Sequence, residues 1–479
     1  MTIDSKLIEG VHSRRWERMN NLITSSGNGM LTITDSKEQT GRVLIVCSAI
    51  IQCLYDCKKD HLIQLPSFAL AGTFGAGATG TVRKWSNTLT ATTGGTTTKI
   101  VITTNINDYC IGEDIIFRTG SNAGQVRKVI NVIMNPAGGA SIFLDSALGS
   151  SVANTDTFQV SSGLFFILGA GTLAAGSFKS YDPLTGVITS LTQTGLPASW
   201  ATDGRLISTS SEEVFALGTA TSATGTTITT TGKTWATDKW INYQVRITAG
   251  TGIGQVRKIT DSDATSLTVA TWTVTPDATS QYVIEGDENA IYLIGNNAVT
   301  MYKYTITGDA TGSWATVSPT VARSVGAGSG MSGNWVQKTG DSDYDDENTG
   351  QAGTWILSFR GAGTSDIEAF NIAGGTAGAG AWKVITYPNK NEGFTAGSAY
   401  ALKKGVLYIR KDNTHRYFQY DIVTNTFKPF SFNAFTDGVA VTGDKTWLWD
   451  VIDSSGNVKL TYLYSWRNTG TELFRTLIY

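Results

Sequence analysis

The residues best suited by type and spacing to bind a metal ion form an acidic run, GDSDYDDENTG, at residues 340–350. Carboxylates at alternate positions suit Ca²⁺, which takes oxygen ligands at close spacing. The run departs from a calcium-binding loop because Asp346 stands where such a loop has glycine, and Ala352 where it has glutamate. We therefore expect a solvated acidic loop, with a bound cation as the alternative. The candidate ligands are Asp341, Asp343, Asp345 and Glu347.

Groups that could perform acid–base or nucleophilic catalysis are few. The histidines are His12, His61 and His415, and none lies in a nucleophile motif such as G-x-S-x-G. Cys53, Cys57 and His61 are loosely spaced for zinc and have no second pair nearby. The glycine-rich runs lie between predicted strands and do not open helices, which argues against a phosphate-binding loop. We expect no enzyme activity and no cofactor.

Composition favours an all-β protein of several compact units. The 479 residues include 53 glycines and 8 prolines, and 16 % of residues are charged, which suits many short strands joined by glycine turns. Lys and Arg number 37 against 39 Asp and Glu, so no basic surface predicts nucleic-acid binding. The longest apolar stretch, residues 43–55, is too short to span a bilayer, and we expect no membrane insertion. Four cysteines are too few for a disulfide framework, so reduced thiols are expected.

One stretch occurs twice and predicts a duplicated module. FRTGSNAGQVRKVI at 117–130 is followed 130 residues later by ITAGTGIGQVRKIT at 247–260, each inside a Thr-rich segment. We interpret residues 80–163 and 219–286 as two copies of one small β-sandwich or barrel module. Alternation along a strand would place the Gln and Arg of each copy on one face, where they could bind a partner. The alternative is that the glycine makes a bend and the strand only pairs. These candidate interaction residues are Gln125, Arg127, Gln255 and Arg257.

A second, weaker repeat lies outside the two modules. An apolar strand is followed by a turn and by a strand that ends in an aromatic residue with Asp, Asn or Thr. The pairs are Tyr181-Asp182, Tyr304-Thr305, Phe370-Asn371 and Tyr420-Asp421, and Trp314, Trp382 and Phe427 follow three of them. Small sheets of this kind stack around an axis, so we predict a β-propeller of five to seven blades with the apolar strands near the axis. The pattern resembles kelch propellers, without their double glycine.

These repeats divide the chain into an N-terminal arm and a propeller with two insertions. Residues 1–41 would form the arm and 42–79 the first propeller strands, with module 1 at 80–163, propeller at 164–218, module 2 at 219–286 and propeller at 287–479. Ser67–Gly72 and Glu213–Gly218 would be the strands from which the modules leave. Leu473–Tyr479 would pair with an early strand to close the ring. The arm would dock on a neighbouring subunit through Arg14, Arg15, Trp16 and Arg18.

The sequence pattern of the modules is similar to that of small β modules that recur in structural proteins of tailed bacteriophages. It reads G-x-G-x-G-Q-x-R-x-I and then T-x-T-P-D-A-T-S-x-Y-x-I. Module 2 keeps it from Gly250 to Ile284, whereas module 1 departs at residues 121–123. The resemblance implies a non-enzymatic virion protein, made in the host cytoplasm, in the tail or neck as a ring or nozzle-type part. A capsid-associated or decoration protein is the alternative position. Its partners would be further copies of itself and other virion proteins.

A carbohydrate-binding propeller is the alternative function. It would be a receptor-binding tail protein, an adhesin or a glycan-cleaving enzyme, with a host-surface glycan as its partner. Trp235, Trp240 and Trp272 could stack on sugar rings.

Overall fold

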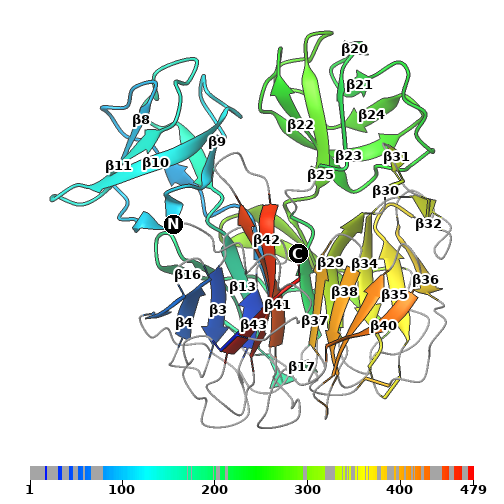
Figure 1. Ribbon diagram of the computed structural model, residues 1–479. Helices are drawn as coiled ribbons and strands as arrows, with labels where there is room; N and C mark the ends of the chain where they lie inside the picture. The colour runs from blue at the N-terminus through cyan, green and yellow to red at the C-terminus, as the bar shows by residue number, and fades with distance from the viewer. Residues whose placement is uncertain are drawn as a thin grey trace.

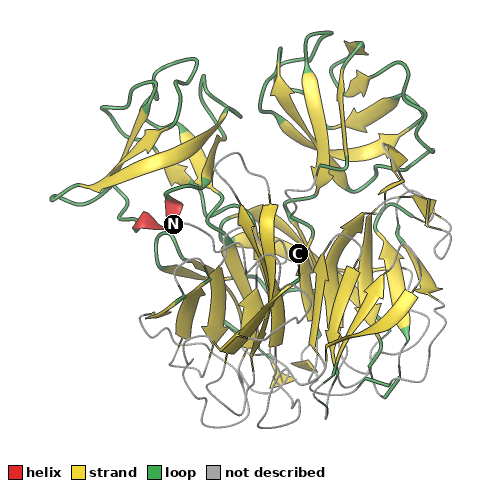
Figure 2. Ribbon diagram, in the orientation of Figure 1, coloured by secondary structure: helices red, strands yellow, loops and turns green. Residues whose placement is uncertain are grey.

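The computed structural model describes residues 79–169, 175–197, 214–294 and 299–318 with few breaks between them, and elsewhere describes mainly strands. Its described residues are strands and loops apart from one short 3-10 helix, η1 (Asp108–Cys110), as Figure 2 shows. The prediction of an all-β chain is therefore confirmed. Among these residues no helix has the length and apolar character needed to cross a membrane.

Six four-stranded antiparallel sheets among the described residues form the body of the molecule. Sheet 1 is β2 (Leu31–Thr34), β3 (Arg42–Val46), β4 (Gln52–Asp56) and β5 (His61–Gln64); sheet 2 is β6 (Thr79–Arg83), β13 (Leu164–Leu168), β15 (Phe178–Asp182) and β16 (Val187–Ser190). Sheet 3 is β18 (Arg205–Ser208), β26 (Ala290–Ile294), β27 (Met301–Gly308) and β28 (Thr311–Val317); sheet 4 is β29 (Gly330–Val336), β34 (Thr354–Phe359), β35 (Ile367–Asn371) and β36 (Ala381–Ile385). Sheet 5 is β37 (Ala399–Lys403), β38 (Val406–Arg410), β39 (Tyr417–Asp421) and β40 (Thr426–Ser431); sheet 6 is β41 (Lys445–Ile452), β42 (Val458–Trp466), β43 (Leu473–Leu477) and β1 (Glu17–Arg18).

Three two-stranded ladders accompany the sheets. They are β14 (Gly171–Thr172) with β17 (Ser199–Trp200), β30 (Lys338–Thr339) with β31 (Ser342–Asp343), and β32 (Asp345–Asp346) with β33 (Gln351–Ala352).

The six sheets follow one another in a closed ring. Their first strands touch in the order β2, β6, β18, β29, β37 and β41. A buried apolar cluster fills each junction between neighbouring sheets, and the one between sheets 6 and 1 joins Tyr55 to Trp447 and Tyr464. Strand β1 completes sheet 6 because Glu17 pairs with Arg475. The predicted pairing of the C-terminal strand with an early strand is confirmed.

The sequence predicts that the apolar strand of each sheet lies nearest to the axis of the ring, but the strands that touch from sheet to sheet are the first strands. The apolar strands β13 and β26 are second in their sheets and fully buried, because they are covered along both edges and on both faces. A less apolar first strand, β6 or β18, stands before each of them. The first strands of sheets 2 and 3 are joined by hydroxyls: Leu206 N donates to Thr79 Oγ1 and Ser208 N to Thr81 Oγ1, both at 2.9 Å.

The aromatic repeat joins the third and fourth strands of the sheets. Tyr304 lies opposite Trp314, and their ring centroids are 5.0 Å apart. Phe370 lies opposite Trp382 in the same way, also at 5.0 Å. The polar residue of the repeat caps the turn that follows, since Leu184 N donates to Asp182 Oδ1 at 2.9 Å. These contacts explain why the repeat has its spacing.

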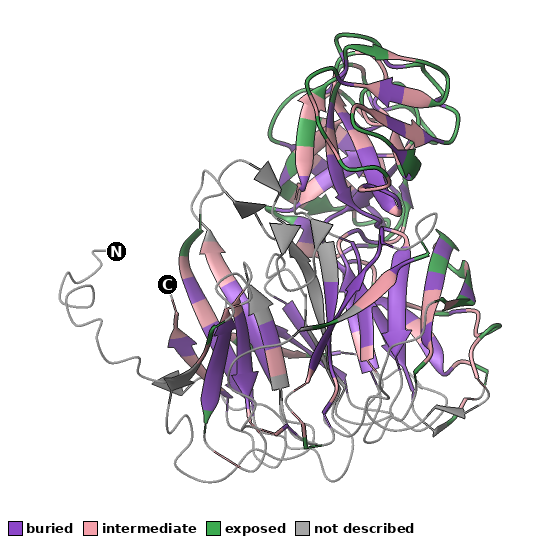
Figure 3. Ribbon diagram, turned by 90° about the vertical axis from the view of Figure 1, so that its right-hand side faces the viewer, coloured by how far each residue is buried: buried purple, intermediate pink, exposed green. Residues whose placement is uncertain are grey.

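Both modules are insertions between the first and second strands of consecutive sheets. Module 1 lies between β6 and β13, and module 2 between β18 and β26, so both stand on the same side of the ring (Figures 1 and 3). Module 1 has the strand order β7 (Leu89–Thr90), β12 (Thr157–Val160), β9 (Asp114–Phe117), β10 (Val126–Met134), β11 (Ala140–Leu144), β8 (Lys99–Ile102). Module 2 has β19 (Ala216–Thr219), β25 (Gln281–Gly286), β22 (Tyr243–Ala249), β23 (Val256–Ser262), β24 (Ser266–Val269), β21 (Thr227–Thr229), β20 (Ser222–Ala223).

The two modules share a topology and a register. Val126 pairs with Ile116 in module 1, and Val256 pairs with Arg246 in module 2. Both residues of the second pair lie 130 positions after those of the first. The bulge that bends the long hairpin strand also recurs, after Val129 and after Ile259. The bend lets one strand join both halves of its sheet.

The structure moves several predicted boundaries. The described residues of the predicted strand at 213–218 do not belong to the ring, because β19 pairs with β25 of module 2, and the ring strand is β18. Module 1 begins after β6, whose five residues pair with β13. Two strands of the predicted arm, β1 and β2, belong to sheets 6 and 1. Residues 67–72 and 14–16 lie outside the described residues.

Candidate functional site

The two modules meet at their repeated turns. Gly124 has φ +76° and Gly254 has φ +88°, a region that side chains rarely adopt. A Cβ added to Gly124 would overlap the backbone of Gly254, and one added to Gly254 would overlap that of Gly124. The turn needs glycine for both reasons, and the contact places the two copies of the repeat against each other.

The repeated arginine ties the start of each hairpin to the loop after it. Arg127 donates from Nε to Ala147 O at 3.0 Å and from Nη2 to Gln125 Oε1 at 2.9 Å. Arg257 donates from Nε to Thr271 O at 3.1 Å and from Nη2 to Thr273 Oγ1 at 2.9 Å. These bonds give the arginines a structural role within their own modules.

The repeated glutamine, at the end of the turn before each hairpin, also bonds to the loop that follows the hairpin. Gln125 Nε2 donates to Asn122 Oδ1 at 3.1 Å, and Gly149 N donates to Gln125 Oε1 at 3.0 Å. Gln255 Nε2 donates to Val274 O at 2.7 Å. Binding of a partner by these four residues stays a prediction.

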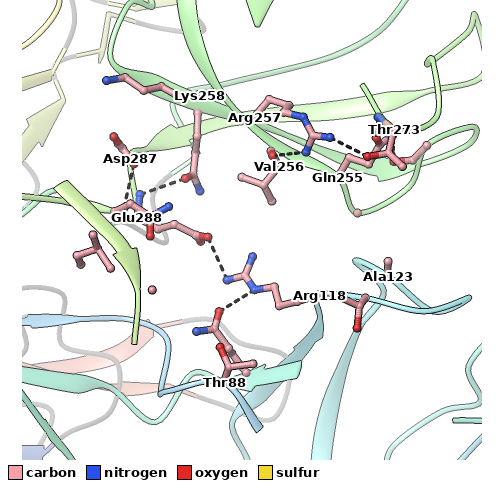
Figure 4. Close-up of a pocket in the computed structure, with 18 of the residues that line it drawn as sticks. Thr88, Arg118, Ala123, Gln255, Val256, Arg257, Lys258, Thr273, Asp287 and Glu288 are labelled. Carbon is pink, nitrogen blue, oxygen red and sulfur yellow. Dashed lines mark hydrogen bonds and ion pairs between the residues drawn. The ribbon is translucent and has the colours of Figure 1, made fainter. Parts of the chain in front are cut away.

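A cleft of about 820 Å³ opens between the two modules and sheets 2 and 3 (Figure 4). Its lining includes Arg83 at the end of β6, and segments from both modules and from the β27–β28 turn. These segments are Arg118–Ser121, Gly252–Lys258, Asp287–Asn289 and Ile306–Asp309. The cleft therefore collects residues that lie more than 200 positions apart in the sequence.

An ion pair crosses this cleft from module 1 to the segment that leads into β26. Arg118 Nη2 lies 3.1 Å from Glu288 Oε1, and Arg118 Nε donates to Gln159 Oε1 at 2.7 Å (Figure 4). Burial acts to raise the pKa of Glu288, but Arg118 and Arg83 outweigh it and the pKa is lowered. Glu288 is therefore a carboxylate held by a positive environment.

Arg83 is the one cleft-lining arginine that the described residues leave unpaired. Arg83 is 4 % exposed, and its side chain makes no hydrogen bond or ion pair with any described residue. Its Nε is buried without a partner. Burial lowers the pKa of Arg83, and the attraction of Glu288 opposes this shift.

A second charged group lies beside the cleft on sheet 3. Burial lowers the pKa of Lys303 to about 8, and the neighbouring Lys258 acts in the same direction while Asp287 opposes it. Burial also raises the pKa of Asp287. Both groups therefore ionise less readily than they would in water.

The predicted cation ligands lie apart from this cleft. Asp343 is in β31 and Asp345 in β32, whereas Asp341 and Glu347 lie outside the described residues. Within the part of the chain that the structure describes, no group of three or more His, Cys, Asp or Glu side chains could hold a metal.

The remaining predicted residues also fall in other places. Of the arm, Arg18 is in β1, and Arg14, Arg15 and Trp16 lie outside the described residues. Of the repeat residues, Gln255 and Arg257 line the cleft, and Gln125 and Arg127 are not among its lining residues. Cys53, Cys57 and Cys110 are buried free thiols.

The prediction that Trp240 and Trp272 stack on sugar rings is wrong. They are 1 % and 4 % exposed and belong to the apolar core of module 2. Trp235 packs against this core, with its ring 6.0 Å from that of Trp240. Tryptophans in a Thr-rich β segment suit a sugar platform and a module core equally well by sequence, and burial decides for the core.

Sequence reasoning missed Arg83, Arg118 and Glu288. None of the three lies in a recognisable motif, and they meet only because the modules leave consecutive sheets. The available signal was topological: both insertions were expected to start from equivalent strands, which implies that the ends of those strands lie close together.

Comparison with known proteins adds no family. No family model matches the chain, and no curated protein matches it. Among solved structures, a Bacteroides thetaiotaomicron protein of unknown function is 10 % identical with a TM-score of 0.19, over 82 % of this chain and 98 % of its own. The endosialidase of phage phi92 is 10 % identical with a TM-score of 0.23, over 97 % of this chain and 58 % of its own. Both TM-scores are too low to support an argument about fold or function.

Proposed function

We propose that this protein is a non-enzymatic structural component of a tailed phage particle, placed in the tail or neck. In this proposal a six-bladed, kelch-like propeller carries two paired β modules on one face. The observation that carries it is the joining of two matching modules, on consecutive sheets, through turns that accept only glycine.

The closed ring supports the propeller. Each of six four-stranded sheets packs its apolar faces on two neighbours, which a single small sheet needs in order to bury both faces. The last sheet takes its fourth strand, β1, from the beginning of the chain. Such pairing of chain ends joins the first and last blades. Six falls within the five to seven blades that the sequence predicts.

The modules support a structural role in a virion. Their sequences are similar to modules of phage structural proteins, and their matching registers show that the duplication was kept as a pair of like-shaped units. The side chains that the repeat contributes are used to hold its own loops. A rigid pair of displayed surfaces suits assembly.

An apolar ridge on module 1 supports assembly with neighbours. Ile130, Ile133 and Met134 on β10 are 56 %, 51 % and 45 % exposed. The positions 130 residues further on in module 2 are Thr260 and Asp263, with Ala264. At these positions only module 1 exposes large apolar side chains, and exposed apolar surface is typical of a region that meets a partner. In this proposal the ridge contacts another subunit of the particle.

Electron microscopy of the purified chain tests the proposal. We expect closed rings or regular arrays of uniform dimensions as concentration rises, and no release of sugar when the protein is incubated with bacterial surface glycans. Separate single particles at every concentration would argue against an assembling virion part. Steady glycan turnover would overturn the non-enzymatic assignment in favour of the alternative function.

A further inference from the structure

We propose that the cleft between the modules binds a sugar acid, a polyhydroxylated ligand whose carboxylate pairs with Arg83. This goes beyond the structural role, which requires no small ligand. The proposal rests on the unpaired guanidinium of Arg83, the charge balance of the lining and the hydroxyl and amide groups around it.

Arg83 supplies the anchor. It is the end residue of β6 and 4 % exposed, yet it lines the cleft and makes no hydrogen bond or ion pair with a described residue. Glu288 attracts it without forming an ion pair. A buried charge without a partner is costly, and native structures normally pair it or bring a ligand to it. The guanidinium offers two parallel N–H groups, which match the two oxygens of a carboxylate.

The other arginines of the cleft are already engaged. Arg118 is held by Glu288 and Gln159, and Arg257 is held by Thr271 and Thr273 of its own module. Among the arginines of the cleft, Arg83 is therefore the one left for an incoming anion, and the exposed Lys258 lines the same cleft.

The charge of the lining suits a single negative charge. Four cationic side chains face three carboxylates, which leaves one positive charge when all of them are ionised. The cations are Arg83, Arg118, Arg257 and Lys258, and the carboxylates are Asp287, Glu288 and Asp309. A carboxylate neutralises that excess, whereas a phosphate dianion would exceed it by one charge.

The rest of the lining suits hydroxyl groups. Ser121 and Asn289 present a hydroxyl and an amide, and the lining has no aromatic ring. Thr119 and Thr307 also line the cleft, and their hydroxyls bond to Thr157 and Thr311. Polar groups of this kind recognise a ligand by hydrogen bonds to its own hydroxyls. The volume of about 820 Å³ lies within the roughly 300–1,000 Å³ of small-molecule sites, and is large enough for a sugar acid.

Isothermal titration calorimetry of the full chain with glucuronate, glucose and inorganic phosphate tests the site. We expect glucuronate to bind, with glucose and phosphate at least tenfold weaker. Arg83→Met should weaken glucuronate binding at least tenfold. Arg360→Met is the control: Arg360 pairs with Asp366 in the turn between β34 and β35, outside the cleft, and its loss should leave binding unchanged.

Glu288→Gln gives a result that structural damage would not produce. It frees Arg118 from its carboxylate partner, so glucuronate should bind several-fold more tightly. If Arg83→Met does not fold, as judged by circular dichroism, Arg83→Lys is measured instead and should bind several-fold more weakly.

Four outcomes overturn the proposal: no glucuronate binding at millimolar concentrations, equal binding of glucose, tighter binding of phosphate, or unchanged binding by a folded Arg83 variant. A protein that fails these tests but still assembles would leave the structural role intact.

Discussion

Replacing Gly124 with alanine should separate the two modules. The backbone of Gly124 is left-handed, and the new methyl group would overlap the backbone of Gly254. Neither turn can move easily, because Gly124 N donates to Phe117 O at 2.6 Å and Gly254 N donates to Ile247 O at 2.7 Å. The neighbouring atoms belong to the main chain and cannot rotate away as a flexible side chain could.

The size of the effect follows from two costs. An L-residue in the left-handed region costs about 1–2 kcal/mol. Forcing a methyl group into a filled contact costs about 1–3 kcal/mol more. Gly112 is the control, since it has φ +87° in the same module and no atom within 4 Å of an added Cβ. Gly112→Ala should therefore cost only the first amount, about 1–2 kcal/mol, and Gly124→Ala about 2–5 kcal/mol.

Hydrogen exchange measured by mass spectrometry can detect the loss of stability at the two turns. A single unfolding curve cannot assign it to them, because the chain has several units. In Gly124→Ala we expect faster exchange in peptides covering residues 118–126 and also 248–256, together with a larger radius of gyration by small-angle X-ray scattering. Gly112→Ala should leave the second peptide unchanged. Equal exchange at residues 248–256 in the two variants would refute the contact between the modules.

Three further predictions concern buried charge, pH and assembly. Arg118→Met should destabilise the contact between module 1 and the segment before β26 by about 3–5 kcal/mol, because Glu288 loses its buried partner, and hydrogen exchange should be faster in peptides covering residues 118–126. Lys128 has an exposed side chain that pairs with Asp114 at 3.2 Å, so Lys128→Met should cost about 1 kcal/mol or less in the same measurement. Burial raises the pKa of Asp182 to about 6, above the value near 3.8 expected in the unfolded chain, so its contribution to stability is present below pH 3.8 and is lost as pH rises through 6. An NMR titration should find this carboxyl midpoint near 6, and a midpoint at 3.8 would contradict the burial. Ile133→Thr, at an exposed position of β10, should change stability by about 0.5 kcal/mol or less yet reduce the mass of any assembly seen by light scattering, and an unaltered assembly would exclude the ridge.

The duplicated modules were predictable from sequence because a short continuous segment of each one carries the repeated pattern. The shared G-Q-V-R-K run implies equal bends and equal registers, and the paired strands bear this out at Val126 and Val256. The glycine that bends the turn was visible, but its contact with the other copy was not, since it depends on where the two insertions leave the ring.

The cleft could not be predicted because its residues come together only in three dimensions. Arg83 ends a short ring strand, and Glu288 follows the last strand of module 2. The first strands of the ring were also missed. Thr79–Arg83 and Arg205–Ser208 are short and partly polar, so the sequence pattern favours the more apolar stretches beside them.

The mass of the purified 479-residue chain in solution, measured by light scattering over a range of concentrations, tests the central proposal most directly. One chain has a mass of 51.1 kDa. The proposal of an assembling virion component predicts a mass that is a fixed multiple of this value, or one that rises with concentration to a defined limit. A mass of 51 kDa at every concentration would contradict it.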